Sequence, residues 1–189
     1  MLSIIHAPNA VLSQVAKPIP VKNGTIDKSI SALITEMKET LLATKDPEGV
    51  GLAAQQVGKS VQLFIVKQSP KAPISVFINP VFVQNTSNQT PETFPQTNGD
   101  KEKKLEGCLS LPNIWGEVKR MPSVTIAYID ENGIAREKTY KGFFATILQH
   151  EYDHLQGVLF PKRVLEQQGT LYKSHKNRKG EEEFDEIEI

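Results

Sequence analysis

Two histidines four residues apart constrain this 189-residue chain more than any other feature. They lie in residues 149–157, which read QHEYDHLQG. On an α-helix of about 3.6 residues per turn, this spacing places the imidazoles of His150 and His154 on one face, close enough to hold one metal ion. Glu151 lies beside them and can reach a water on that metal without being a ligand. This HExxH pattern is typical of zinc hydrolases, in which the glutamate is the general base.

The residues around the motif favour a helix over about 142–156. Phe143 and Ile147 continue the helical spacing of the two histidines, and Gly157 stands where a C-terminal cap is expected. The alternative is a solvated helix that carries two histidines by coincidence. Three matched positions in so short a chain disfavour that alternative.

The third metal ligand decides the class of site. A metzincin would place a histidine at position 160, but Phe160 stands there and cannot bind metal. A thermolysin-like site would use a later glutamate, and Glu166 is the nearest, but little chain follows it for a second protease lobe. The remaining soft ligand is Cys108, the only cysteine. One thiolate and two imidazoles leave a fourth position open for water, as in catalytic sites.

Three motifs occur in order: GVGLAAQQ at 49–56, EGCLS at 106–110 and QHEYDH at 149–154. Together they resemble the peptide deformylases, which remove the formyl group from N-formylmethionine on new polypeptides. The resemblance covers about residues 4–163.

The resemblance implies a mechanism. Cys108, His150 and His154 would hold a divalent metal, and the metal-bound water would attack the formyl carbon with Glu151 as general base and then acid. The Gln56 side chain and the Leu109 backbone N–H would stabilise the oxyanion with the metal. The ligands suit several metals, and the resemblance points to Fe(II) as native, with zinc, nickel or cobalt as substitutes.

Substrate-binding residues are also predicted. The resemblance implies that backbone groups of the glycine-rich motif pair with the substrate peptide as an added strand. One and two turns before His150, three side chains share its helix face, and these are candidates for the wall of the methionine pocket: Phe143, Thr146 and Ile147. From the other two motifs we add Val50, Gly51, Glu106 and Gly107. By resemblance, Arg120 and Asp153 form a pair that orients the helix. Trp115 is left out of the predicted site.

Composition limits the partners. Lysine plus arginine equals aspartate plus glutamate at 22 each, so we expect no sequence-specific nucleic-acid binding. A single cysteine, no signal peptide and no apolar run of about 20 residues predict a bacterial-type cytoplasmic enzyme away from membranes. The resemblance implies N-formylmethionyl nascent peptides as substrates and a transient ribosome contact, and we expect a monomer.

The predicted fold is α+β: a single domain over 1–189, with antiparallel or mixed sheets packed around the metal-binding helix. An amphipathic helix of about 17 residues follows an extended arm at 4–24 and ends at Asp46-Pro47. Predicted strands fall at 61–66, 74–78, 81–83, 115–119, 123–130 and 134–140. Residues 84–104 are predicted to be a polar loop insertion, and 165–189 a hairpin or an acidic tail.

Three rival functions remain to be weighed. A zinc endopeptidase would need a metal ligand downstream of the motif. A metal-stabilised binding module would need a fourth protein ligand, and His6 and His175 near the termini have no matching context. An inactive relative would be expected to lack Glu151 or Gln56, and both are present.

Overall fold

The computed structural model describes residues 1–45, 48–69, 71–83 and 105–188. Its fold is α+β, with two sheets whose strand pairs are all antiparallel. The predictions for Asp46-Pro47 and for the loop at 84–104 lie outside the described residues. Within them, no helix is long and apolar enough to cross a bilayer.

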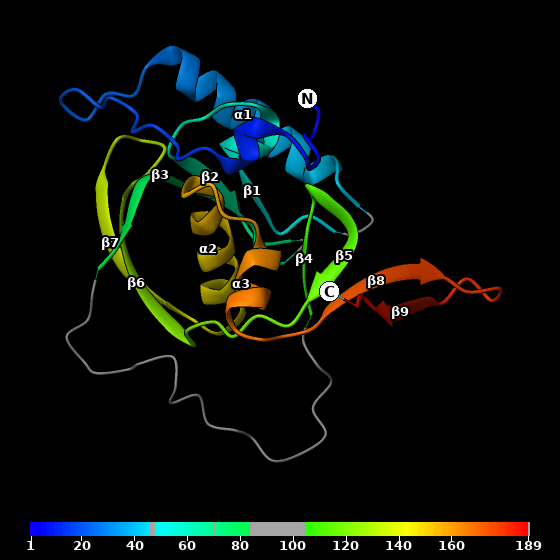
Figure 1. The fold of residues 1–189 in the computed structure, drawn as a ribbon. Coiled ribbons are helices and arrows are strands. Elements are labelled where there is room, and N and C mark those ends of the chain that lie inside the picture. The colour runs from blue at the N-terminus through cyan, green and yellow to red at the C-terminus, as the bar shows by residue number, and fades with distance from the viewer. Residues whose placement is uncertain (46–47, 70, 84–104, 189) are drawn as a thin grey trace.

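A five-stranded sheet forms the larger half of the molecule, in the order β1-β2-β3-β6-β7 (Figure 1). Its strands are β1 (Gly51–Ala53), β2 (Leu63–Val66), β3 (Ser75–Phe82), β6 (Ser123–Ile129) and β7 (Ala135–Lys141). The smaller sheet has the order β4-β5-β8-β9. It consists of β4 (Glu106–Cys108), β5 (Leu111–Gly116), β8 (Leu171–Lys176) and β9 (Glu182–Glu186).

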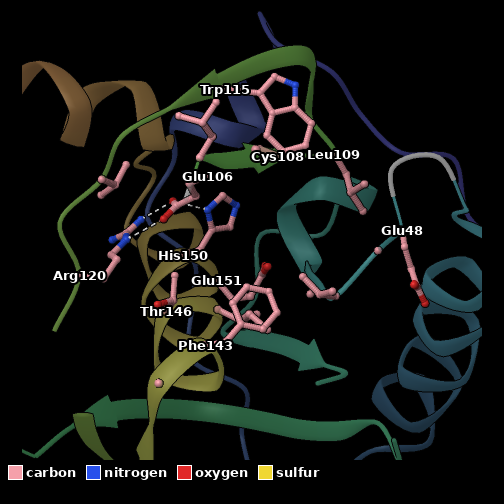
Figure 2. Close-up of a pocket in the computed structure, with 18 of the residues that line it drawn as sticks. Glu48, Glu106, Cys108, Leu109, Trp115, Arg120, Phe143, Thr146, His150 and Glu151 are labelled. Atoms are coloured by element: carbon pink, nitrogen blue, oxygen red, sulfur yellow. Dashed lines mark hydrogen bonds and ion pairs between the residues drawn. The ribbon is translucent and has the colours of Figure 1, made fainter. Parts of the chain in front are cut away.

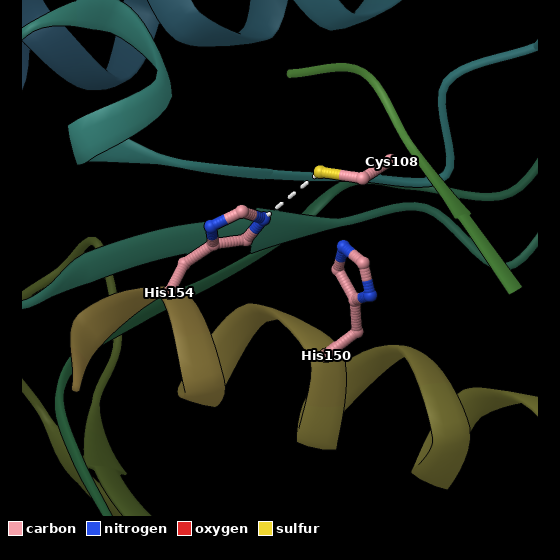
Figure 3. Close-up of side chains that lie close together, drawn as sticks. All are labelled: Cys108, His150 and His154. Atoms are coloured by element: carbon pink, nitrogen blue, oxygen red, sulfur yellow. Dashed lines mark hydrogen bonds between the residues drawn. The ribbon is translucent and has the colours of Figure 1, made fainter. Parts of the chain in front are cut away.

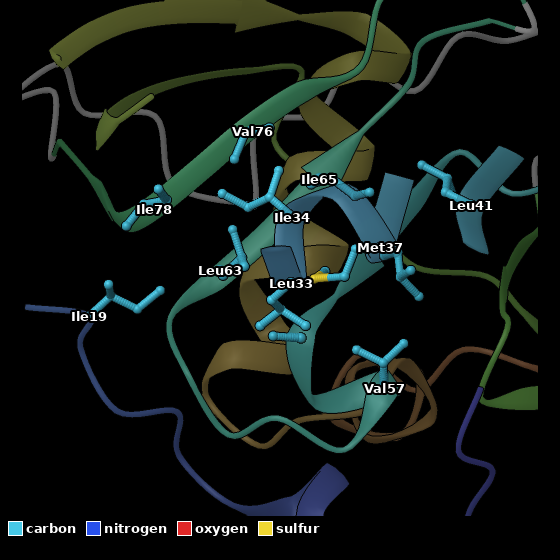
Figure 4. Close-up of a cluster of buried hydrophobic side chains, with 12 residues drawn as sticks. Ile19, Leu33, Ile34, Met37, Leu41, Val57, Leu63, Ile65, Val76 and Ile78 are labelled. Atoms are coloured by element: carbon cyan, nitrogen blue, oxygen red, sulfur yellow. The ribbon is translucent and has the colours of Figure 1, made fainter. Parts of the chain in front are cut away.

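Two helices cover opposite faces of the larger sheet because its central strands are apolar on both sides. Helix α1 (Lys28–Ala43) begins after the N-cap Asp27, whose side chain accepts from the Ser29 N–H. Its apolar side packs in one cluster with alternate strand residues (Figure 4): Leu52, Leu63, Ile65, Val76 and Ile78. The residues between them face α2 (Gly142–Leu155) in a second cluster: Ala53, Phe64, Val66 and Phe77.

Helix α2 therefore lies between the two sheets, with β6 and β7 on one side and β4 and β5 on the other (Figure 1). It ends at the C-cap Gln156, and Gly157 follows with φ 69°, a left-handed conformation that favours glycine. This agrees with the predicted cap.

Three of the predicted elements differ from those in the structure. The runs at 74–78 and 81–83 form one strand, β3, with a register shift where Asn79 takes φ 48°. The strand predicted at 115–119 is β5, which starts at Leu111 because it pairs with β4. The arm at 4–24 contains the 3-10 helix η1 (Ala10–Ser13) and buries Leu12.

The short helix α3 (Phe160–Glu166) was not predicted. It packs Phe160 and Val164 against the smaller sheet. Seven residues are too few to display a helical period that sequence analysis can distinguish. The C-terminal segment forms a hairpin, β8–β9, which extends away from the rest of the molecule (Figure 1).

Candidate active site

Three side chains that can bind metal converge where α2 meets β4. Cys108 is the last residue of β4, and His150 and His154 lie one turn apart on α2 (Figure 3). Their ligand atoms all lie within 4.8 Å of one another, and Cys108 Sγ is 3.3 Å from His154 Nε2. All three are buried. Burial and convergence of these donor types fit a divalent cation such as iron or zinc.

Glu106 fixes the orientation of His150. Its Oε1 lies 2.7 Å from His150 Nδ1, and this contact leaves Nε2 for the metal side of the ring. Burial would raise the pKa of Glu106, but hydrogen bonds from His150 and Arg120 outweigh it and lower the pKa to about 2. The carboxylate is therefore an ionised acceptor. Burial also lowers the pKa of His154 well below its ordinary value, which keeps this imidazole neutral.

A buried ion-pair network ties β4 to α2. Arg120 donates to Glu106 Oε1 at 2.7 Å and Oε2 at 3.0 Å, and to Asp153 Oδ2 at 2.7 Å. On its other side, Asp153 accepts from Arg163 of α3 at 2.7 Å. The Arg120–Asp153 pair implied by the resemblance is thus in contact. Glu106 and Arg163 extend that pair into a chain from the cysteine strand to α3.

Glu151 is buried next to the three metal-ligand candidates. The residue is 3% exposed, and its Oε2 has no hydrogen-bond partner among the described residues. Burial raises the pKa of Glu151 to about 7. The carboxylate lies directly over Gly51, where any Cβ would overlap it. Glycine at this position thus makes room for the carboxylate.

Gln56 lies in the 3-10 helix η2 (Ala54–Val57) and links two of the motifs. Its Oε1 accepts from the Ala53 N–H at 2.8 Å, while Nε2 donates to Ser110 Oγ at 3.2 Å and lies 3.5 Å from Cys108 Sγ. The amide donor thus lies beside the metal-ligand candidates. Leu109 follows Cys108, and its apolar side chain packs on the α1 cluster.

A cavity of about 800 Å³ opens onto this cluster (Figure 2). Every predicted substrate-binding residue lines it: Val50, Gly51, Glu106, Gly107, Phe143, Thr146 and Ile147. Glu106, however, is held by Arg120 and His150, so it is an ion-pair partner as well as a wall. The signal was available in the sequence, because residues two apart on a strand point to the same face, and Cys108 is two positions away.

Other lining residues were missed by the sequence analysis. They include Glu48, Trp115, Val118 and Met121. Trp115 lines the cavity because β5 pairs it with Gly107, where a Cβ would meet the indole at 2.8 Å. That pairing could not be expected because no strand was predicted at residues 106–108, where β4 lies.

A Cys/His/His donor set, a buried carboxylate and an adjoining cavity define the class as metal-dependent hydrolases. Comparison with known proteins narrows the class. The family model described as polypeptide deformylase matches residues 1–169, so the chain belongs to the peptide deformylase family of metal-dependent enzymes that remove the formyl group from N-formylmethionine peptides.

Individual relatives agree. A peptide deformylase of Psychrobacter arcticus is 38% identical over 165 residues, which cover 85% of this chain and 77% of the relative. One from Brucella suis is 35% identical over 161 residues, with coverage of 83% and 81%. The crystal structure of a Thermotoga maritima peptide deformylase aligns with a TM-score of 0.68 and 32% identity, covering 86% of this chain and 97% of that one.

Proposed function

We propose that Cys108, His150 and His154 hold one divalent metal and that Glu151 is the proton carrier for removal of the formyl group from N-formylmethionyl nascent peptides. The observation that carries this proposal is the buried carboxylate of Glu151, with an unpartnered Oε2 beside a convergent Cys/His/His set. A buried carboxylate without a partner is costly for the fold, so a role in chemistry accounts for it.

The metal, when bound, polarises the formyl oxygen and acidifies water. Glu151 accepts the proton of the attacking water and later delivers it to the departing amine of methionine. Its pKa of about 7 suits both directions of transfer near neutral pH. Glu106 keeps His150 in the tautomer that binds metal, and Arg120 holds Glu106 and Asp153 in place.

Gln56 and Leu109 are proposed to stabilise the developing oxyanion. The Gln56 amide is held at both ends, by Ala53 and Ser110, so its Nε2 is preorganised next to Cys108. Such donors act best when no reorganisation is needed during reaction. The Leu109 N–H is assigned this role by resemblance alone.

The substrate peptide is proposed to pair with β1 as an added strand. β1 is the first strand in the sheet order and therefore an edge, and its first residue, Gly51, lines the cavity together with the preceding Val50. The methionine side chain would lie against the cavity residues of α2: Phe143, Thr146 and Ile147. Gly107 lines the cavity beside Cys108 and makes room for the Trp115 indole.

The native metal is proposed to be Fe(II), with zinc, nickel or cobalt able to replace it, because one thiolate and two imidazoles accept all four. The enzyme is proposed to act in the bacterial cytoplasm as a monomer that meets nascent chains, with a transient ribosome contact. Metal analysis of protein purified without oxygen tests the identity of the metal, and the mass of the protein in solution tests whether it is a monomer.

Anaerobic hydrolysis of formyl-Met-Ala-Ser, measured by released formate, tests the reaction. Wild type should release formate. Glu151→Gln, which preserves the shape of the side chain, should lower the rate of formate release by at least about a hundredfold at equal metal content. No formate from fully metallated wild type would refute the proposal. Cys108→Ala should lose the metal, whereas retained metal together with cleavage of unformylated peptides would favour the endopeptidase alternative.

A further inference from the structure

Trp115 forms part of the cavity wall opposite α2. In Figure 2 the indole and Phe143 lie on opposite sides of His150 and Glu151. The indole packs on Gly107, next to Cys108, so the cysteine strand is the surface against which it lies. It is the only tryptophan in the chain.

The C-terminal hairpin holds this indole in place by two contacts. Trp115 Nε1 donates to the buried Ser174 Oγ of β8 at 3.0 Å. The Phe184 ring of β9 meets the indole edge to face, with centroids 5.9 Å apart and planes at 83°. Phe184 is 42% exposed. Its ring therefore packs against the indole and supports it, and it does not belong to a buried core.

An extended substrate would bring its second side chain to this wall. Successive side chains of an extended peptide point to opposite faces. If the methionine side chain enters the α2 side of the cavity, the side chain of the next residue faces the other side, where Trp115 lies. An indole face favours an apolar or aromatic group.

On this basis, and resting on the proposed deformylase function, we infer that Trp115 determines specificity for the second residue of the substrate. Ser174 and Phe184 are positioning residues that hold it. The C-terminal hairpin thereby contributes to substrate choice, although none of its described residues lines the cavity.

Selectivity between two peptides tests the inference. Wild type should have a kcat/KM about fivefold higher for formyl-Met-Phe-Ser than for formyl-Met-Ala-Ser. Trp115→Ala should abolish this ratio, and Phe184→Ala should reduce it about twofold by lowering kcat/KM for the phenylalanine peptide. Phe184→Tyr, which keeps an aromatic ring at this position, should keep the wild-type ratio. Glu182→Ala, an exposed substitution on the same strand, is the matched control and should leave the ratio unchanged.

The tryptophan emission supplies a second readout. Binding of formyl-Met-Phe-Ser to the Glu151→Gln protein should shift Trp115 emission more than binding of formyl-Met-Ala-Ser does. Without bound peptide, the Phe184→Ala protein should show a lower anisotropy of Trp115 emission, because the indole loses its contact with the Phe184 ring. A wild-type ratio near one, or a ratio unaltered by both Trp115→Ala and Phe184→Ala, would overturn the inference. Formate release from both peptides would still uphold the deformylase function, which falls only if neither is hydrolysed.

Discussion

The two sides of helix α2 are held by different forces. Toward the larger sheet, it buries apolar side chains against Phe64, Val66 and Phe77. Toward the smaller sheet, the helix is held by charges, through the chain of ion pairs that joins Glu106, Arg120 and Asp153. Burial of apolar surface is non-directional, whereas bidentate ion pairs fix position and angle.

This contrast assigns stability and precision to different interfaces. Truncation on the apolar side lowers stability through the cavity that it creates, but it leaves no polar or charged group without a partner. The charged side cannot lose one partner without leaving another buried and unpaired. Cys108 and His150 come from opposite sides of the charged interface, so the metal-ligand geometry depends on it.

The largest expected effect comes from Arg120→Leu. Both Glu106 and Asp153 would lose a buried partner, with a loss of about 4 kcal/mol in the free energy of unfolding. The metal content of folded protein should also fall, because β4 is no longer fixed to α2. Denaturant unfolding and metal analysis measure the two effects. Adding Glu106→Gln should recover part of the stability but not the metal, and full recovery of metal would contradict the assigned role of the network.

Met37→Ala provides an apolar counterpart in the α1 cluster, on the face of the larger sheet opposite α2. Met37 is fully buried in the α1 cluster, so truncation should lower the free energy of unfolding by about 3 kcal/mol. Formate release per folded molecule and metal content should stay at wild-type values. The exposed Leu42 on the same helix is the control, because Leu42→Ala should change stability by less than about 0.5 kcal/mol. Metal loss in Met37→Ala would contradict the expected difference between apolar packing and the ion-pair network in their effect on the metal site.

Gly51→Ala tests the contact between β1 and the proposed base. The added methyl would overlap the Glu151 carboxylate and push it from its position. A displacement of about 1 Å should lower kcat about a hundredfold while the metal stays bound. Steady-state rates of formate release beside metal analysis measure this. A rate within about twofold of wild type would show that Glu151 does not need this position.

The sequence predicted what depends on local periodicity. The helical spacing of His150 and His154, the cap at Gly157 and the amphipathic α1 are set by residues near one another in the chain, and the structure contains all three. The cavity residues on α2 follow from the same period.

Contacts that depend on how separate elements pack could not be predicted in this way. The link of Arg163 to Asp153 needs α3, a helix too short to have a recognisable pattern. The place of Trp115 needs the pairing of β4 with β5 and of β5 with β8. Sequence spacing fixes which face a side chain takes, but not which segment it meets there.

Arg163→Gln should have the smallest effect and sharpens the comparison within the charged interface itself. Arg163 contacts the same carboxylate as Arg120, but its side chain is 33% exposed, whereas that of Arg120 is 9% exposed. Water screens the outer pair, and Asp153 keeps its inner partner. We therefore expect a loss of about 1 kcal/mol in the free energy of unfolding, with the metal retained. Denaturant unfolding at low and high salt measures this, since the cost should shrink with salt for Arg163→Gln and persist for Arg120→Leu. Equal losses in both variants would mean that exposure does not separate the two pairs.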